Sequence, residues 1–125
     1  MLKIDWQSGV PAYDQIVKGF IKLIAIGAMA PGDKMPSVRA MASKLGVNPN
    51  TIQKAYLILE EKGIIYSVAG KGSFVSDGHD AIKTVIENFK DQLEKTAKEL
   101  VRLGLSKDEL FEIIDKAYKE GGKEK

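Results

Sequence analysis

Hydrophobic positions at helical spacing alternate with turn signals through the first half of the chain. From residue 12 to residue 26, apolar residues recur every three or four positions, which predicts a first helix that ends at Gly27. The same spacing predicts a second helix, capped by Ser37, and a third helix over residues 49–62. The expected buried stripes are Val38, Met41, Ala42 and Leu45 in the second helix, and Ile52, Ala55, Tyr56 and Leu59 in the third.

Alternating patterns typical of strands flank these three helices. Residues 2–6 predict a short strand, which a turn at residues 7–11 follows. After the third helix, residues 64–68 and 73–75 predict two strands joined by a Gly-Lys-Gly turn. Three helices followed by a hairpin form a winged helix-turn-helix. The fold class is therefore mainly α with a small β wing.

The second half of the chain carries a long amphipathic pattern. Ser76, Asp77 and Gly78 are interpreted as a hinge. Beyond them, apolar residues alternate three- and four-residue steps over about three heptads, as in a coiled coil, until Gly104. Ser106 and Glu109 have the spacing of a capping box, which predicts a last helix. That helix is expected to bury Leu110, Ile113, Ile114 and Ala117, and residues 121–125 to be a disordered tail.

A seam of this length on a separate segment is expected to meet a second copy of the chain. We therefore expect a winged helix-turn-helix domain over residues 1–76 and a helical dimerisation segment over residues 77–125. The residues assigned to dimerisation are Ile82, Ile86, Phe89, Leu93, Leu100, Leu103, Phe111 and Ile114.

Composition narrows the class of protein. The chain has 125 residues, of which 44% are hydrophobic, enough for one domain and a small appendage. No apolar run approaches the ~20 residues of a membrane span, and the first residues do not form a signal-peptide pattern. The chain contains no cysteine, which excludes disulfides, thiolate metal sites and cysteine nucleophiles. We expect a cytoplasmic protein.

The positive charge is concentrated in the helix-turn-helix and the wing. Residues 34–71 contain six basic and two acidic side chains, for a net charge of +4, whereas residues 79–125 have a net charge of −1. This excess of positive charge fits a phosphate-facing surface, although a solvated face would often show as much.

The turn before the third helix and the start of that helix carry the candidate DNA-binding chemistry. Asn48 can cap the helix, and Pro49 fits its first turn. The exposed positions that follow hold short polar or cationic side chains, which suit base edges and phosphates. These are the features of a recognition helix. These exposed positions are Asn50, Thr51, Gln53 and Lys54.

The order and spacing of these motifs resemble the DNA-binding domain of the GntR family of bacterial transcription regulators. The resemblance covers residues 11–75, over half of the chain. The matching pieces are Pro11-x-Tyr13-x-Gln15-Ile16, Gly27-x-x-x-Pro31-Gly32-Asp33-Lys34-Met35-Pro36-Ser37-x-Arg39, Leu45-Gly46-Val47-Asn48-x-Asn50-Thr51, Ala55-Tyr56-x-x-Leu59-Glu60-x-x-Gly63 and Gly70-Lys71-Gly72-Ser73-Phe74-Val75. The short segment after the wing resembles the YtrA-like subfamily, whose C-terminal segment dimerises.

Together with the resemblance, these motifs assign the following residues to the binding of double-stranded DNA: Arg39, Asn48, Pro49, Asn50, Thr51, Gln53, Lys54, Gly70 and Lys71. The resemblance implies that Arg39 contacts bases, that the start of the third helix contacts bases and phosphates, and that Gly70 approaches the minor groove. Better-studied members carry arginine where this chain has Pro49 and Gln53. Pro49 cannot donate a hydrogen bond, whereas Gln53 can bind adenine through two. The resemblance implies a homodimeric regulator, expected to be a repressor.

Other functions have weaker support in the sequence. Winged helices also serve as protein-interaction modules, which is the alternative, but such modules lack the cluster of Asn50, Gln53 and Lys54 with its neighbouring cations. No histidine pair, serine triad or phosphate loop indicates an enzyme, and no cofactor is expected. His79 lies beside Asp77 and Asp80, but a solvent-exposed histidine is favoured over a metal site. A small-molecule effector, if one exists, would bind at the dimer seam or between the domains.

Overall fold

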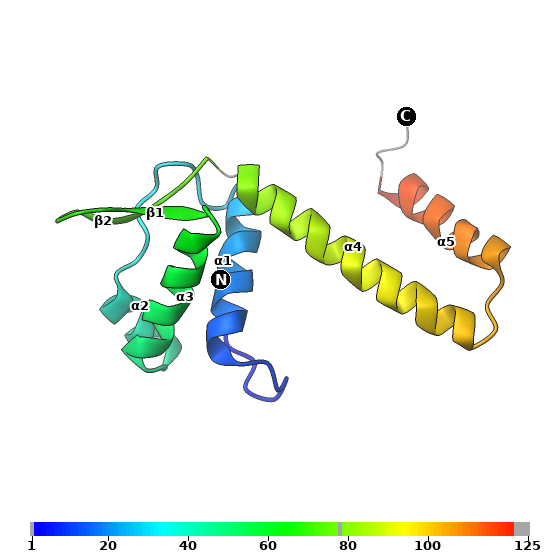
Figure 1. Ribbon diagram of the computed structural model, residues 1–125, viewed down its shortest axis with the longest axis horizontal. Coiled ribbons are helices and arrows are strands. Elements are labelled where there is room, and N and C mark those ends of the chain that lie inside the picture. Colours follow the sequence, from blue (N-terminus) through cyan, green and yellow to red (C-terminus); the bar gives the residue numbers. More distant parts are fainter. Residues whose placement is uncertain (1, 78, 122–125) are drawn as a thin grey trace. The chain divides into compact units, whose positions relative to one another are not determined.

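A computed structural model describes residues 2–77 and 79–121 of the chain. The described residues contain five helices and one antiparallel hairpin (Figure 1). They fall into two compact units, Met1–Ile86 and Glu87–Lys125. The elements in chain order are α1 (Ala12–Ala25), α2 (Val38–Leu45), α3 (Pro49–Glu61), β1 (Ile65–Val68), β2 (Gly72–Val75), α4 (His79–Arg102) and α5 (Lys107–Glu120).

The first unit is the winged helix-turn-helix that the sequence predicts. Helices α1 and α3 pack along each other, α2 packs on α3, and the hairpin follows the end of α3 (Figure 1). The rings of Phe20 and Tyr56 meet edge to face, with centroids 5.8 Å apart, and join α1 to α3. The largest fully buried side chains, each worth about 1.5–3 kcal/mol of burial, are Ile16, Ile52, Leu59, Ile64, Ile65 and Val75.

The predicted stripes of the second and third helices are largely confirmed. All four stripe residues of α3 are buried, as are Met41 and Ala42 of α2. Val38 and Leu45, at the two ends of α2, are only half-buried, although both pack against the core. A short helix with two buried residues depends on α3 and the neighbouring loops to hold it in place.

The strand predicted over residues 2–6 is wrong, because this segment has no strand beside it. The Gln15 side chain takes the place of a neighbouring strand. Its Oε1 accepts the Asp5 N–H at 2.8 Å, and its Nε2 donates to the Asp5 carbonyl at 2.9 Å. Leu2 packs against α1 at Gly19, where a Cβ would overlap the Leu2 side chain. The segment is thus an extended arm on α1.

The first turns of α4 belong to the winged unit. Ala81 is buried in its core, and Val85 packs against that core. Ser76 and Asp77 connect the wing to α4, whereas Gly78 lies outside the described residues, so the predicted hinge stays a prediction. The boundary expected at residue 76 likewise stays a prediction.

The second unit contains the rest of α4 and all of α5. Gly104, with φ of +99°, follows the end of α4, and the predicted capping box begins α5. The Ser106 Oγ accepts the Glu109 N–H at 3.2 Å, and the Glu109 carboxylate accepts the Ser106 N–H at 3.1 Å. The tail predicted at residues 121–125 lies outside the described residues except for Gly121. No helix among the described residues is long and apolar enough to cross a membrane.

The last helix does not bury the four residues expected of it. No residue of α5 is buried: Leu110 is partly exposed, and Ile113, Ile114 and Ala117 are exposed. The periodic pattern correctly marked an apolar face. The prediction of burial within one chain was wrong because no other described element of the chain packs widely against that face.

Candidate nucleic-acid interface

The start of α2 presents Arg39 to solvent. Ser37 caps the helix, and its Oγ accepts the Ala40 N–H at 3.1 Å, as predicted. Arg39 is the second residue of the helix and is exposed. At the other end, Gly46 takes a left-handed conformation with φ of +70°, which turns the chain toward α3. The residues of the short turn therefore determine how α2 and α3 are oriented.

Asn48 begins α3 and is the predicted cap. Its Oδ1 accepts the Asn50 N–H at 2.8 Å, and Pro49 occupies the first helical position. The Asn48 oxygen is therefore engaged within the protein. Its Nδ2 group has no hydrogen-bond partner among the described residues and can still donate to a phosphate.

The outer face of α3 is polar and accessible. Asn50, Gln53 and Lys54 are exposed, and Thr51 is half-buried. The opposite face of the same turns is buried in the core. The structure thus separates the residues that support the helix from those that can reach a ligand, as the sequence pattern predicts.

The wing is a tight hairpin with Lys71 in its turn. Strands β1 and β2 pair antiparallel, with Val68 opposite Gly72. Gly70 and Gly72 have φ of +75° and +112°, conformations that favour glycine. The Lys71 N–H donates to the Val68 carbonyl at 2.9 Å, and the Lys71 side chain is exposed. The hairpin therefore holds one cation at its tip.

The loop before α2 pairs with strand β2 of the wing. Lys34 forms an antiparallel bridge with Phe74, and the Met35 N–H donates to the Ser73 carbonyl at 2.8 Å. The stem of Lys34 lies against Gly72, where a Cβ would stand 3.2 Å from the Lys34 Cε. Lys34 thus joins the wing, although the sequence analysis did not select it. The Gly-Asp-Lys run before Pro36 was the available signal.

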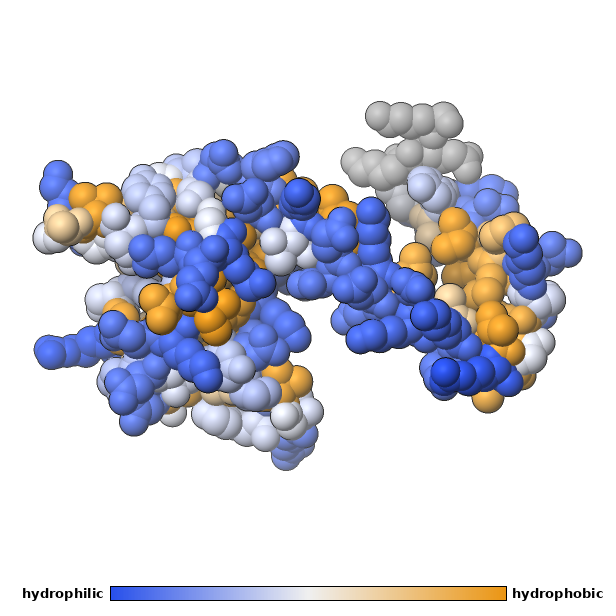
Figure 2. Space-filling model, in the orientation of Figure 1, coloured by the Kyte–Doolittle hydropathy of each residue, from blue (hydrophilic) through white to orange (hydrophobic). Residues whose placement is uncertain are grey.

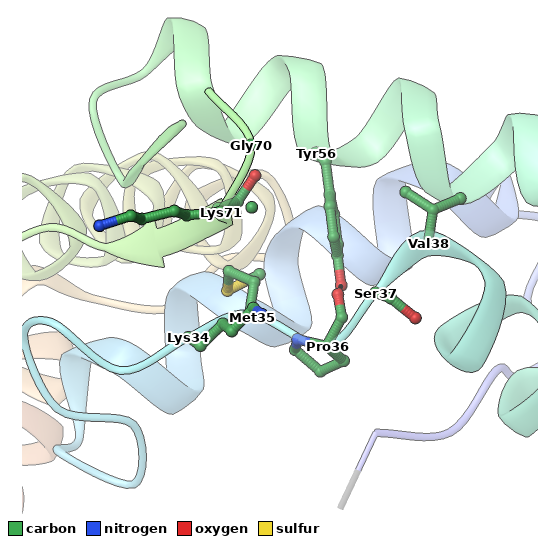
Figure 3. A pocket seen from close by; sticks show the side chains of 10 residues that line it. Lys34, Met35, Pro36, Ser37, Val38, Tyr56, Gly70 and Lys71 are labelled. Carbon is green, nitrogen blue, oxygen red and sulfur yellow. Dashed lines mark hydrogen bonds between the residues drawn. The ribbon is translucent and has the colours of Figure 1, made fainter. Parts of the chain in front are cut away.

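An open pocket of ≈390 Å³ lies between the wing and the start of α2 (Figure 3). The Tyr56 ring reaches from α3 toward Pro36, and Lys34 and Lys71 also line the pocket. Among the residues that the structure describes, no acidic side chain lines it. The complete lining is Lys34, Met35, Pro36, Ser37, Val38, Tyr56, Gly70, Lys71, Gly72 and Ser73.

Tyr56 supports the pocket through its hydroxyl group. The Tyr56 hydroxyl donates to the Pro36 carbonyl oxygen at 2.7 Å. Burial raises the pKa of Tyr56 to about 12, because the phenolate would lose its hydration. The phenol therefore remains a donor at neutral pH and ties α3 to the loop that leads into α2.

Lys54 lies over the ring of Tyr13. The Lys54 Nζ is 3.9 Å from the ring centroid, a distance typical of a cation–π contact. Tyr13 comes from the first turn of α1, so the pair links α1 to the recognition helix.

The candidate cations have no carboxylate partner among the described residues. Within the described part of the chain, none of Lys34, Arg39, Lys54 and Lys71 forms an ion pair; the recorded pairs involve other lysines and Arg102. Unpaired cations on the α2, α3 and wing surfaces can each accept a phosphate without first losing a carboxylate. The described residues also bring together no group of three histidine, aspartate or glutamate side chains that could hold a metal ion.

The residues assigned to dimerisation remain accessible in the single chain. Phe89, Leu93 and Phe111 are 60%, 56% and 56% exposed. Figure 2 shows apolar residues gathered along α5 and the end of α4. Other large apolar side chains on α4, on α5 or just after α4 are also exposed: Ile82, Ile86, Val101, Leu103, Ile113, Ile114 and Tyr118. Leu100 is half-buried.

Comparison with known proteins agrees with this geometry. The family model described as "Bacterial regulatory proteins, gntR family" matches residues 12–75. The HTH-type transcriptional repressor YtrA of Bacillus subtilis (strain 168) is 40% identical over 101 residues, covering 81% of this chain and 76% of that protein. The uncharacterized HTH-type transcriptional regulator YhcF of the same strain is 37% identical over 119 residues, covering 94% and 98%.

Solved structures show the same arrangement. A GntR family transcriptional regulator from Listeria monocytogenes superposes with a TM-score of 0.74 at 38% identity, covering 89% of this chain and 98% of that one. The DNA-binding domain of AraR in complex with operator ORX1 gives a TM-score of 0.56 at 29% identity, covering 59% and 94%. The resemblance noted in the sequence is confirmed: the chain belongs to the gntR family of bacterial regulatory proteins and is a YtrA-like DNA-binding transcription regulator, not an enzyme.

Proposed function

We propose that the chain represses transcription in the bacterial cytoplasm as a homodimer that binds an operator with two-fold symmetry. The observation that supports the dimer most directly is the apolar face of α4 and α5. Seven large apolar side chains at dimerisation positions are exposed: Ile82, Ile86, Phe89, Leu93, Leu103, Phe111 and Ile114. Large apolar side chains exposed in this number are typical of a protein–protein interface.

The proposed DNA contacts divide by the chemistry of the side chains. Arg39, Asn50 and Gln53 read base edges, since arginine binds guanine and amides bind adenine through paired hydrogen bonds. Asn48, Thr51, Lys54 and Lys71 hold phosphates, with Pro49 beginning the helix that carries them. To these we add Lys34, because it lies against the wing and faces the same pocket as Lys71.

In this proposal, the wing lies along the neighbouring minor groove of the DNA. Gly70 has open space where a Cβ would stand, so the hairpin tip leaves room for a close approach of the backbone. Operator binding itself is supported by AraR, whose DNA-binding domain has been solved in complex with operator ORX1. Repression is supported by YtrA, which is named a repressor.

An effector would act on this dimer by changing how its two DNA-binding domains are placed. A ligand that changes the spacing or tilt of the two winged helices would change their fit to successive major grooves. We place the adjustable element at Ser76 and Asp77, which connect the wing to α4. We propose that such a ligand binds at the seam between the two chains of the dimer.

Stoichiometry on DNA tests the proposal. Sedimentation of the full chain with a duplex that carries one symmetric site should give two chains per duplex. A duplex with half of that site should bind at least tenfold more weakly at the same salt concentration. A single chain bound with equal affinity to both duplexes would contradict the homodimeric mode.

A further inference from the structure

The contact between Tyr13 and Lys54 joins a half-buried ring to an exposed cation. Tyr13 packs against the hydrophobic core from the first turn of α1, whereas the Lys54 side chain is in solvent on α3. The Nζ-to-centroid distance of 3.9 Å places the ammonium directly on the ring. The carboxylate next to Tyr13 is engaged elsewhere, since Asp14 pairs with Lys18 at 3.1 Å.

An aromatic partner suits a lysine that must bind phosphate. A carboxylate would neutralise the ammonium and would compete with a phosphate oxygen for its hydrogens. A ring attracts the cation through its quadrupole but leaves the net charge at +1 and leaves N–H donors free. Lys54 forms no ion pair with any described residue, so its charge is available.

The position of the ring is fixed by the core and by the segment that enters α1. The core supports it from below, and the chain that enters α1 is fixed by Gln15, whose Nε2 donates to the Val10 carbonyl at 2.9 Å. A lysine side chain ordinarily loses much rotamer freedom when it binds a phosphate. A fixed ring that already restricts the side chain lowers this loss, which is the general benefit of preorganisation.

We propose that Tyr13 is a positioning residue for DNA binding. It holds the ammonium of Lys54, in the second turn of the recognition helix, without neutralising its charge. The proposal rests on the phosphate role of Lys54 proposed above. Tyr13 would act through Lys54 and not through a DNA contact of its own.

A double-mutant cycle tests the proposal on the full chain. Tyr13→Leu removes the ring, Tyr13→Phe keeps it without the hydroxyl, and Lys54→Met removes the cation. The affinity for one random duplex is measured by fluorescence anisotropy at fixed salt. We expect Tyr13→Leu to weaken binding about two- to fivefold per chain and Tyr13→Phe to bind like the wild type. In the Lys54→Met background, Tyr13→Leu should change the affinity less than 1.5-fold.

Each other outcome overturns the proposal in a distinct way. If Tyr13→Phe loses as much affinity as Tyr13→Leu, the hydroxyl acts and not the ring face. If Tyr13→Leu costs as much in the Lys54→Met background, Tyr13 acts independently of Lys54. If Lys54→Met binds DNA as tightly as the control Lys62→Met, Lys54 does not bind phosphate. That result contradicts the proposed function of Lys54 and, with it, the role of Tyr13.

A spectroscopic measurement covers the case in which Tyr13→Leu does not fold. In the wild-type protein, the ring should shift the proton resonances of the Lys54 Cε methylene to higher field. This shift should persist in Tyr13→Phe and disappear in Tyr13→Met, a flexible replacement for the ring. An unshifted Lys54 resonance in the wild type would overturn the proposal whatever the variants do.

Discussion

The Tyr56 hydroxyl donates a hydrogen bond of 2.7 Å to the Pro36 carbonyl, so the recognition helix is tied to the loop before α2. The same loop pairs with β2 through Lys34 and Met35. The buried phenol of Tyr56 thus connects α3 to the loop that pairs with the wing and leads into α2. The spacing of the proposed DNA contacts depends on this connection.

We expect Tyr56→Phe to lower the free energy of unfolding by about 1 kcal/mol, because the Pro36 carbonyl loses its donor. The wild type should also lose stability in alkali. The pKa of Tyr56 is raised to about 12 in the folded state, above an unfolded value of 10.0, so the folded state retains the proton longer. The resulting stabilisation is complete below about pH 10 and is lost as the pH rises toward about 12.

Denaturant unfolding at several pH values compares the two proteins. The pKa difference corresponds to roughly 2–3 kcal/mol, which only the wild type should lose between about pH 10 and 12. The stability advantage of the wild type, about 1 kcal/mol near neutral pH, should therefore shrink above about pH 10 and reverse before about pH 12. A constant difference between wild type and Tyr56→Phe would contradict a buried, hydrogen-bonded phenol.

Arg39→Ala and Gln53→Ala should each weaken specific DNA binding by roughly 1–3 kcal/mol, because each removes a proposed contact to base edges. Competition between operator and random duplex measures this loss. Arg102→Ala and Gln92→Ala are matched controls on α4, and they should retain the specificity ratio. Unchanged operator affinity in both test variants would remove the assignment of base readout.

Lys71→Ala and Lys34→Ala should weaken binding to operator and random DNA alike, since phosphate contacts carry no sequence information. Each variant should also reduce the slope of log affinity against log salt by about 1. A salt titration on both duplexes measures the two effects together. A loss confined to one sequence would argue against phosphate contacts.

Leu93→Asp should dissociate the proposed dimer, because a charge would be buried in an apolar seam without a partner. Sedimentation equilibrium across a range of concentrations measures the change. Lys95→Asp places the same side chain two residues away, on the other side of α4, and should leave the dimer intact. An intact Leu93→Asp dimer would move the interface elsewhere.

The parts of the fold that short-range chemistry determines were predictable from the sequence. The caps at Ser37 and Asn48, the left-handed Gly46 and the capping box at Ser106 each depend on residues a few positions apart. Helical periodicity likewise placed α1, α2 and α3 and separated the buried face of α3 from its polar face.

Features that depend on distant partners were not predictable in the same way. Alternation at residues 2–6 indicated a strand, but strand formation needs a neighbouring strand, and Gln15 satisfies the Asp5 backbone instead. The pairing of Lys34 with Phe74 and the contact of Lys54 with Tyr13 both join segments about forty residues apart. Periodicity also marked the apolar face of α5 without showing what would cover it.

Selection of bound duplexes from a random DNA pool tests the central claim most directly. At moderate salt, the full chain should enrich duplexes with two related half-sites in inverted orientation, one helical turn or more apart. The enriched duplexes should bind less tightly as salt rises, because phosphate contacts release counterions. A chain that retains no duplex even at low salt, or that enriches no common sequence, would contradict a paired, sequence-reading winged helix.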